Sequence, residues 1–243
     1  MSKLLPIGRV LYAVAILGLG ILCIISLDFI IGRPPKWADG LSLNPALAYV
    51  SGGIIILSCL AILLNQKGYF AALGIAGLIL LLSISRHIPN FMNDWLNAYK
   101  SIALLGGTLI IAASFDDRKS KPLITMGSIF LAIFFIACGY AHIKFYDLVK
   151  EFIPAYIPFR GFFAYFTAIC LIAGGIGILI PRTQKLAALL SGIMLTGWFL
   201  MLHIPRFLNN MQDQSDRLGL CESLAFAGIF FVLASLANRR SYY

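Results

Sequence analysis

Residues 123–143 read LITMGSIFLAIFFIACGYAHI, a run without Asp, Glu, Lys or Arg. As an α-helix this run would be about 30 Å long, which is the thickness of the hydrocarbon core of a bilayer. Hydrocarbon excludes charge along the whole length of a span, whereas a soluble helix carries charges at helical spacing. Seven further charge-free runs are found at residues 10–27, 46–64, 69–85, 101–115, 161–180, 186–204 and 223–237. The pattern predicts eight transmembrane helices, and the two shortest runs, 101–115 and 223–237, reach full length only if their helices extend back through Lys100 and Glu222.

The composition of the 243-residue chain agrees with this pattern. Hydrophobic residues make up 60% of the chain and charged residues 12%, the mean hydropathy is +0.90 and the formal net charge is +9. A soluble domain is about half apolar and about one quarter charged. We therefore expect an all-α integral membrane protein, which excludes a single-pass receptor and a large soluble catalytic domain.

The distribution of basic residues predicts the orientation. The amino terminus and every second connector carry ten Lys and Arg residues against two acidic ones, and the other connectors carry nine against eight. Short basic connectors favour the cytoplasm, so both termini are expected there, in a cell membrane of the bacterial inner-membrane kind. No signal peptidase site follows the first run, which is expected to remain as an uncleaved anchor. Because the positive charge lies beside the spans, it indicates anionic lipid and no nucleic acid.

An internal repeat divides the chain into two halves. The heptapeptide HIPNFMN at residues 87–93 recurs as HIPRFLN at residues 203–209, with five of seven positions identical. Similar offsets align Gly8 with Gly127 and Ser101 with Ser223. Each half contains an even number of spans, so both halves enter the membrane from the same side. The sequence thus predicts two parallel four-helix repeats, residues 1–118 and 119–243, related by an axis along the membrane normal.

Several short motifs resemble the DoxX family of four-helix membrane proteins. They are Gly8-Arg9 before the first span, Gly139-Tyr140-Ala141-His142 at the end of the fifth, the two His-Ile-Pro motifs, and the small-residue run at 103–107. The chain looks like a tandem, fused DoxX-like pair, although Gly127 is followed by Ser128 where the first half has Arg9. The resemblance implies a membrane subunit similar to those of thiosulfate:quinone oxidoreductase, or a partner of another redox enzyme, with a quinone as a possible cofactor.

Polar residues gather at span ends on the predicted outer side. This set could bind an anionic headgroup, a quinone ring, a metal or a partner protein. The alternative is structural: the histidines satisfy helix-end carbonyls, with Pro89 and Pro205 stopping each helix, and the aspartates are boundary residues near aromatic interface anchors. The candidate ligand or partner residues are His87, His142, His203, Asp28, Asp147, Arg86 and Arg206.

Lys100 and Glu222 occupy equivalent positions of the two repeats with opposite charges. If their helices lie near the axis, an ion pair between them could join the halves. Lys100 could also reach the interface alone with its long side chain, whereas the shorter Glu222 has the greater need of a partner. Lys100→Glu should then destabilise the protein, and an added Glu222→Lys should restore it.

Other cofactor chemistry finds little support. The five cysteines are scattered through apolar spans without a Cys-x-x-Cys pair, which favours buried small hydrophobic residues. His87 and His203 match in depth, as haem ligation would require, but duplication already explains this match, so haem is disfavoured. No clustered Cys/His motif indicates a metal, and no Walker or dinucleotide motif is found.

Two classes of function fit these features. In the first, the chain is a non-catalytic accessory or anchor subunit in a membrane redox or envelope process, such as a subunit of a quinone-linked oxidoreductase, with a polar site at the outer helix ends. In the second, it is a small-molecule or lipid carrier that uses the interface between the repeats. The span interiors contain no charge for a site at mid-depth, where carriers bind their substrates, and this favours the first class.

Overall fold

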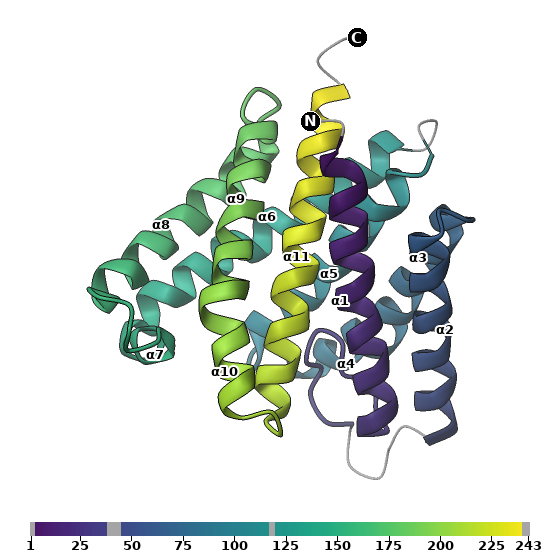
Figure 1. Cartoon of the computed structure of the whole chain (residues 1–243), viewed down its shortest axis with the longest axis horizontal. Helices are drawn as coiled ribbons and strands as arrows, with labels where there is room; N and C mark the ends of the chain where they lie inside the picture. Colours follow the sequence, from purple (N-terminus) through teal and green to yellow (C-terminus); the bar gives the residue numbers. More distant parts are fainter. Residues whose placement is uncertain (1–2, 38–44, 117–119, 240–243) are drawn as a thin grey trace.

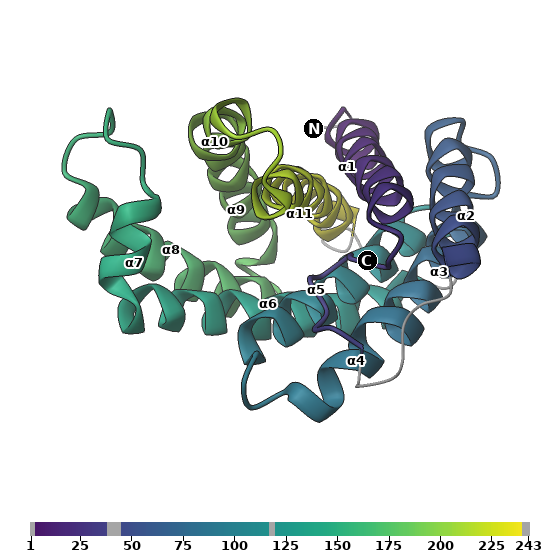
Figure 2. The same cartoon turned by 90° about the horizontal axis from the view of Figure 1, so that it is seen from below.

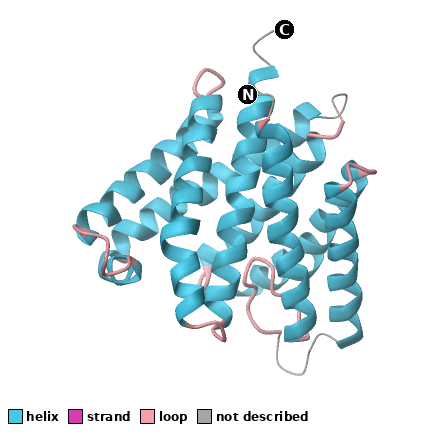
Figure 3. Cartoon of the chain, in the orientation of Figure 1, coloured by secondary structure: helices cyan, strands magenta, loops and turns pink. Residues whose placement is uncertain are grey.

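The computed structural model describes residues 3–37, 45–116 and 120–239. All regular structure in this part of the chain is helical, and no strand is found in it (Figure 3). The predicted repeat boundary between residues 118 and 119 lies outside the described residues.

The first half contains four long helical segments, the third of which is interrupted. A π-helical turn, η1, follows α3, and a 3-10 turn, η2, ends the segment. The elements are α1 (Leu4–Ser26), α2 (Pro45–Leu63), α3 (Gly68–Ile79), η1 (Leu80–Ile84), α4 (Ser85–His87), η2 (Ile88–Asn90) and α5 (Trp95–Ala113).

The second half has the same succession, with one short helix added in a connector. A π-helical turn, η3, again lies near the end of its third long segment. The elements are α6 (Ser120–Lys144), α7 (Tyr146–Phe152), α8 (Arg160–Leu179), α9 (Gln184–Trp198), η3 (Phe199–His203), α10 (Ile204–Asn209) and α11 (Gln214–Arg239).

Among the described residues, eight helices are long and apolar enough to cross a membrane. Each coincides with one of the charge-free runs, which confirms the eight predicted spans at this level. Helices α5 and α11 extend back past the charge-free runs to Trp95 and Gln214, and therefore include Lys100 and Glu222. The two short runs are thus parts of full-length helices.

Two pairs of long helices form the centre of the bundle. Helix α1 packs against α11, and α5 packs against α6, with a further contact between α5 and α11. Helices α2 and α3 lie on one side of this centre and α8 and α9 on the other (Figures 1 and 2). Both termini lie at one end of the bundle (Figure 1). We call the opposite end, where α5 and α11 begin, the distal end.

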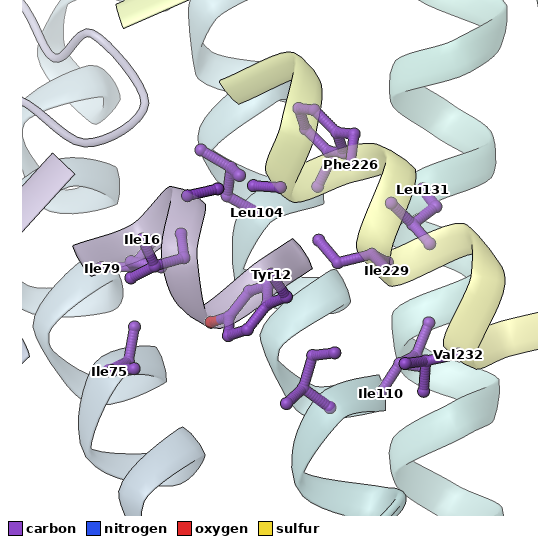
Figure 4. Close-up of a cluster of buried hydrophobic side chains, with 14 of the residues drawn as sticks. Tyr12, Ile16, Ile75, Ile79, Leu104, Ile110, Leu131, Phe226, Ile229 and Val232 are labelled. Atoms are coloured by element: carbon purple, nitrogen blue, oxygen red, sulfur yellow. The ribbon is translucent and has the colours of Figure 1, made fainter. Parts of the chain in front are cut away.

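The middle of the bundle is filled by large apolar side chains. Tyr12 and Ile16 of α1 meet Leu104 and Ile110 of α5, with Phe226 of α11 beside them, and all five are almost fully buried (Figure 4). The Tyr12 hydroxyl lies 2.7 Å from the Thr108 hydroxyl, so this buried polar pair is satisfied. Large apolar side chains also point outward along the helices, for example Phe162 and Ile169 of α8, as expected of helices that face lipid.

The expectation that Pro205 stops its helix is wrong. Helix α10 continues from Ile204 to Asn209, directly after the π-helical turn η3. Pro205 has no backbone N–H to donate to the carbonyl of Met201, and the Tyr156 hydroxyl donates to that carbonyl instead. In the first half, Pro89 lies within the 3-10 turn that ends the segment at Asn90.

Candidate functional site at the distal end

Two cations share one buried carboxylate at the distal end. Arg33 Nε lies 3.0 Å from Glu222 Oε2, and Lys100 Nζ lies 3.3 Å from the same oxygen. Glu222 belongs to α11, Lys100 belongs to α5, and Arg33 belongs to the connector that follows α1. We call Arg33, Lys100 and Glu222 the distal polar cluster. It includes the ion pair expected between Lys100 and Glu222, and it adds a second cation.

The chain turns sharply to bring Arg33 inward. Gly32 has φ +79° and Arg33 has φ +55°, both in the left-handed region. The Ser101 hydroxyl of α5 donates to the Gly32 carbonyl at 3.0 Å, and a Cβ atom on Gly32 would lie 3.0 Å from that of Ser101. Glycine therefore satisfies both the backbone angle and the close approach to α5.

Both cations have further hydrogen-bond partners besides Glu222. Arg33 donates through Nη1 to the Ser215 hydroxyl at 2.7 Å and through Nη2 to the Ser215 carbonyl at 3.0 Å. Lys100 Nζ donates to Asn97 Oδ1 at 3.2 Å. The cluster carries two positive charges and one negative charge, so it retains one excess positive charge among largely desolvated groups.

Three buried side-chain atoms at this end have no hydrogen-bond partner among the described residues. They are Glu222 Oε1 and both ring nitrogens of His87. Buried polar atoms are usually satisfied by protein or by bound water, so each exception requires an explanation. An acceptor oxygen and an imidazole, which can donate from one nitrogen and accept at the other, are suited to a small polar ligand or to water.

His203 lies beside the distal polar cluster. A Cβ atom placed on Gly219 would be 2.9 Å from His203 Nδ1 and 3.5 Å from Arg33 Nη2. Gly219 is three residues before Glu222, so it lies on the same face of α11. The absence of a side chain at Gly219 thus leaves space for the imidazole and the guanidinium together.

Asp28 and Arg86 form a separate clamp. Arg86 Nη1 and Nη2 each donate to a different oxygen of Asp28 at 3.1 Å, and Arg86 also donates to the carbonyls of Phe29 and Pro35. The guanidinium stacks on Trp37 at 4.4 Å, and the Trp37 indole N–H donates to Asp28. This buried, bidentate arrangement fastens the connector after α1 onto α4 and has a structural role.

The other sequence candidates do not join the distal polar cluster. Arg206 pairs with Asp216 at 2.8 Å and stacks on Phe152. His142 Nδ1 lies 2.8 Å from the Cys138 carbonyl, one turn earlier in α6. Asp147 is exposed in the first turn of α7.

Arg33 is not predicted from the sequence as a site residue, because its connector reads as an exposed outer loop. In the structure Phe29 and Ile31 of this connector are fully buried. The connector therefore packs into the bundle, and Arg33 contacts Glu222 of α11. The one local signal is the Gly32-Arg33 pair within an apolar stretch that begins at Phe29.

No group of three or more His, Cys, Asp or Glu residues that could hold a metal ion is found in the described part of the chain. The five cysteines are free thiols.

A protein family described as a domain of unknown function, DUF8561, matches residues 131–226. This segment runs from α6 into α11 and includes His142, His203 and Glu222. No curated protein matches the chain. No solved structure matches it either. The similarity to DoxX proteins therefore stays a prediction.

Proposed function

We propose that the chain is a multi-pass membrane protein of DoxX-like type that serves as a non-catalytic accessory or anchor subunit in a membrane redox or envelope process. The observation that carries this proposal is the distal polar cluster, which lies at one end of a closely packed bundle whose middle is filled by apolar side chains. Arg33 of this cluster and His203 beside it are only partly buried, so a partner can reach them, and the packed helices hold them in place.

Two parallel four-helix repeats are part of the proposal. The helix contacts support it, because α1 packs on α2, α2 on α3 and α3 on α5 in the first half, and α6 on α8, α8 on α9 and α9 on α11 in the second. The contacts between the halves, α5 with α6 and α11 with α1, are also equivalent under the repeat. Both third segments contain a π-helical turn.

Equivalent glycines also support a repeat. Gly8 of α1 faces the carbonyl of Gly228 of α11, and Gly127 of α6 faces the carbonyl of Gly106 of α5. The sequence offsets relate Gly8 to Gly127 and Gly106 to Gly228. The same close backbone contact is thus made twice between the halves, as expected of small-residue packing between membrane helices.

The packing favours an accessory subunit over a carrier. A carrier binds its substrate near mid-depth, between halves that move against each other. Here that region contains Ile16, Leu104, Ile110 and Phe226, all buried. The two backbone contacts made by the glycines leave the halves little freedom to separate.

The excess of basic residues at the termini supports cytoplasmic termini in a bacterial inner membrane, and this orientation places the distal polar cluster on the outer side.

A quinone is a chemically suitable ligand, because its quinol form donates hydroxyl protons and its oxidised form offers carbonyl acceptors. Glu222 Oε1 can accept from the former, and His87 can donate to the latter.

Affinity purification from native membranes tests this role. We expect the intact chain to bring down a redox or envelope enzyme in stoichiometric amount, and His203→Ala to reduce its recovery. Arg182→Gln is the matched control, because Arg182 is exposed at the opposite end of the bundle. Recovery of the chain alone, or substrate flux through liposomes that contain only this chain, would overturn the proposal.

A further inference from the structure

A groove on the outside of the bundle lies near the distal polar cluster but is separate from it. Its volume is about 600 Å³, within the range of small-molecule sites. It lies between α6 and the first turns of α5, together with the turn that precedes α5. The lining residues are Phe91, Met92, Trp95, Tyr99, Ile133, Ile136, Ala137, Tyr140 and Lys144.

The aromatic rings of the groove support one another. Tyr99 packs edge-on against Phe91, with ring centroids 5.4 Å apart, and against Trp95 at 6.2 Å. Trp95 in turn lies 6.2 Å from the Tyr140 ring across the groove. A pre-formed aromatic wall of this kind loses little side-chain entropy when a ligand binds.

The groove is ordered by polarity along α6. Ile133 and Ile136 form an exposed apolar wall, Tyr140 follows, and the exposed Lys144 ends the helix. Ile133 and Lys144 are about 16 Å apart along the helix axis, close to the hydrocarbon thickness of one leaflet, about 15 Å. The side chains along α6 thus match the regions of a lipid in order: apolar side chains for the acyl chains, an aromatic ring for the interface and a cation for the headgroup.

The charge of the groove favours an anionic headgroup. Lys144 Nζ lies 5.9 Å from the centre of the Tyr140 ring, and Lys144 forms no ion pair with a described residue. None of the lining residues is acidic. An ammonium group at headgroup depth attracts phosphate and the additional negative charge of an anionic lipid.

We propose that this groove is a specific binding site for one anionic phospholipid, with the acyl chains against Ile133 and Ile136, the glycerol region against Trp95 and Tyr140, and the phosphate at Lys144. The inference rests on the membrane location in the proposed function, but not on the accessory role.

Lipid binding to the purified full-length chain tests the proposal. The detergent-solubilised protein is titrated with phosphatidylglycerol or with phosphatidylcholine of the same acyl chains, and retained lipid is counted by native mass spectrometry. We expect one retained phosphatidylglycerol in preference to phosphatidylcholine, and about fivefold weaker retention in Lys144→Gln. Lys150→Gln is the matched control, because Lys150 lies over the Tyr146 ring, outside the groove.

A second measurement locates the lipid. Phosphatidylglycerol brominated on its acyl chains should quench tryptophan fluorescence in the intact chain, and Trp95→Phe should remove most of this quenching, whereas Trp198→Phe should leave it. The proposal would be overturned by equal retention of both lipids, by unchanged lipid retention in Lys144→Gln, or by quenching that persists in Trp95→Phe. A disulfide-linked dimer of the Met92→Cys variant would also overturn it, because such a dimer would assign the groove to a second copy of the chain.

The membrane location is checked separately by washing native membranes at alkaline pH. Release of the chain into the supernatant would contradict the proposed function itself. Retention in the membrane together with non-selective lipid binding would overturn only the lipid site.

Discussion

Glu222 joins three segments that are far apart in the sequence. Its Oε2 atom accepts from Arg33 and from Lys100, and its side chain is only 6% exposed. Removing one partner of a buried charge pair leaves the other charge without compensation, and this costs more than the pair itself contributes. The carboxylate should therefore matter more than either cation.

We expect Glu222→Gln to lower the free energy of unfolding by about 3 kcal/mol, because two cations lose their counter-ion together. Arg33→Met and Lys100→Met should each lower the free energy of unfolding by less than Glu222→Gln does, since Glu222 keeps one cationic partner in either variant. Denaturation of the protein in mixed micelles measures the free energy. Glu151→Gln is the control, because Glu151 is exposed on α7. A cost for Glu222→Gln no larger than that of this control would contradict the role of the carboxylate.

The charge-reversed pair gives a further check on the second cation. Lys100→Glu combined with Glu222→Lys restores the ion pair, but it also places a lysine beside Arg33. Full restoration of stability is expected from the sequence alone, whereas the structure predicts only partial restoration. Full restoration would show that Arg33 does not interact with position 222.

At the scale of helices, small residues decide how closely the two halves approach. A Cβ atom on Gly8 would lie 2.6 Å from the Gly228 carbonyl oxygen and 2.9 Å from the Val232 backbone nitrogen. Both atoms belong to the backbone of α11, so a rotamer change cannot relieve the overlap. Helix α1 would have to move away from α11.

Gly8→Ala should therefore destabilise the protein by about 1–3 kcal/mol, the usual cost of overpacking. Gly53→Ala in α2 is the control, because no atom of another helix lies within 4 Å of the position of its Cβ. It should be neutral, or stabilising by up to about 1 kcal/mol through helix propensity. Thermal unfolding in detergent compares the two variants. Equal stability would mean that α1 and α11 do not make this contact.

The long helices were predictable from the sequence, because a helix that crosses the hydrocarbon core needs a charge-free run of residues. Each such run predicts one helix. The π-helical turns η1 and η3 could not be predicted, since the sequences of Leu80–Ile84 and Phe199–His203 resemble the rest of an apolar span. The continuation of α10 through Pro205 depends on Tyr156, 45 residues away along the chain from Met201, whose carbonyl it satisfies. The residues around Pro205 in the sequence do not predict this distant hydrogen-bond donor.

The distal polar cluster was half predictable. Lys100 and Glu222 follow from the repeat, because equivalent positions on two helices near an axis must be close. Arg33 does not follow, because its position depends on how Phe29 and Ile31 pack after α1 ends. His142, Asp147 and Arg206 share the same end of the spans, but end position alone does not bring side chains into contact.

At the scale of the whole molecule, α1 and α5 of the first half pack against α11 and α6 of the second, and the ion pairs described above lie at the distal end. The middle is apolar and closely packed (Figure 4). Such a molecule suits a subunit that holds a recognition site, whereas a carrier needs halves that alternate between two arrangements. The difference is one of motion, and it can be measured without knowing any ligand.

The most direct measurement is a pair of spin-label distances between α2 and α8 in lipid nanodiscs, with the native cysteines replaced by alanine. One label pair is placed at the distal end, on the exposed positions Leu47 and Phe162, and the other at the opposite end, on Leu63 and Leu179. Halves that stay packed together should give a single narrow distance distribution at each end. Two populations at both ends, with one distance lengthening as the other shortens, would contradict it and establish alternating halves.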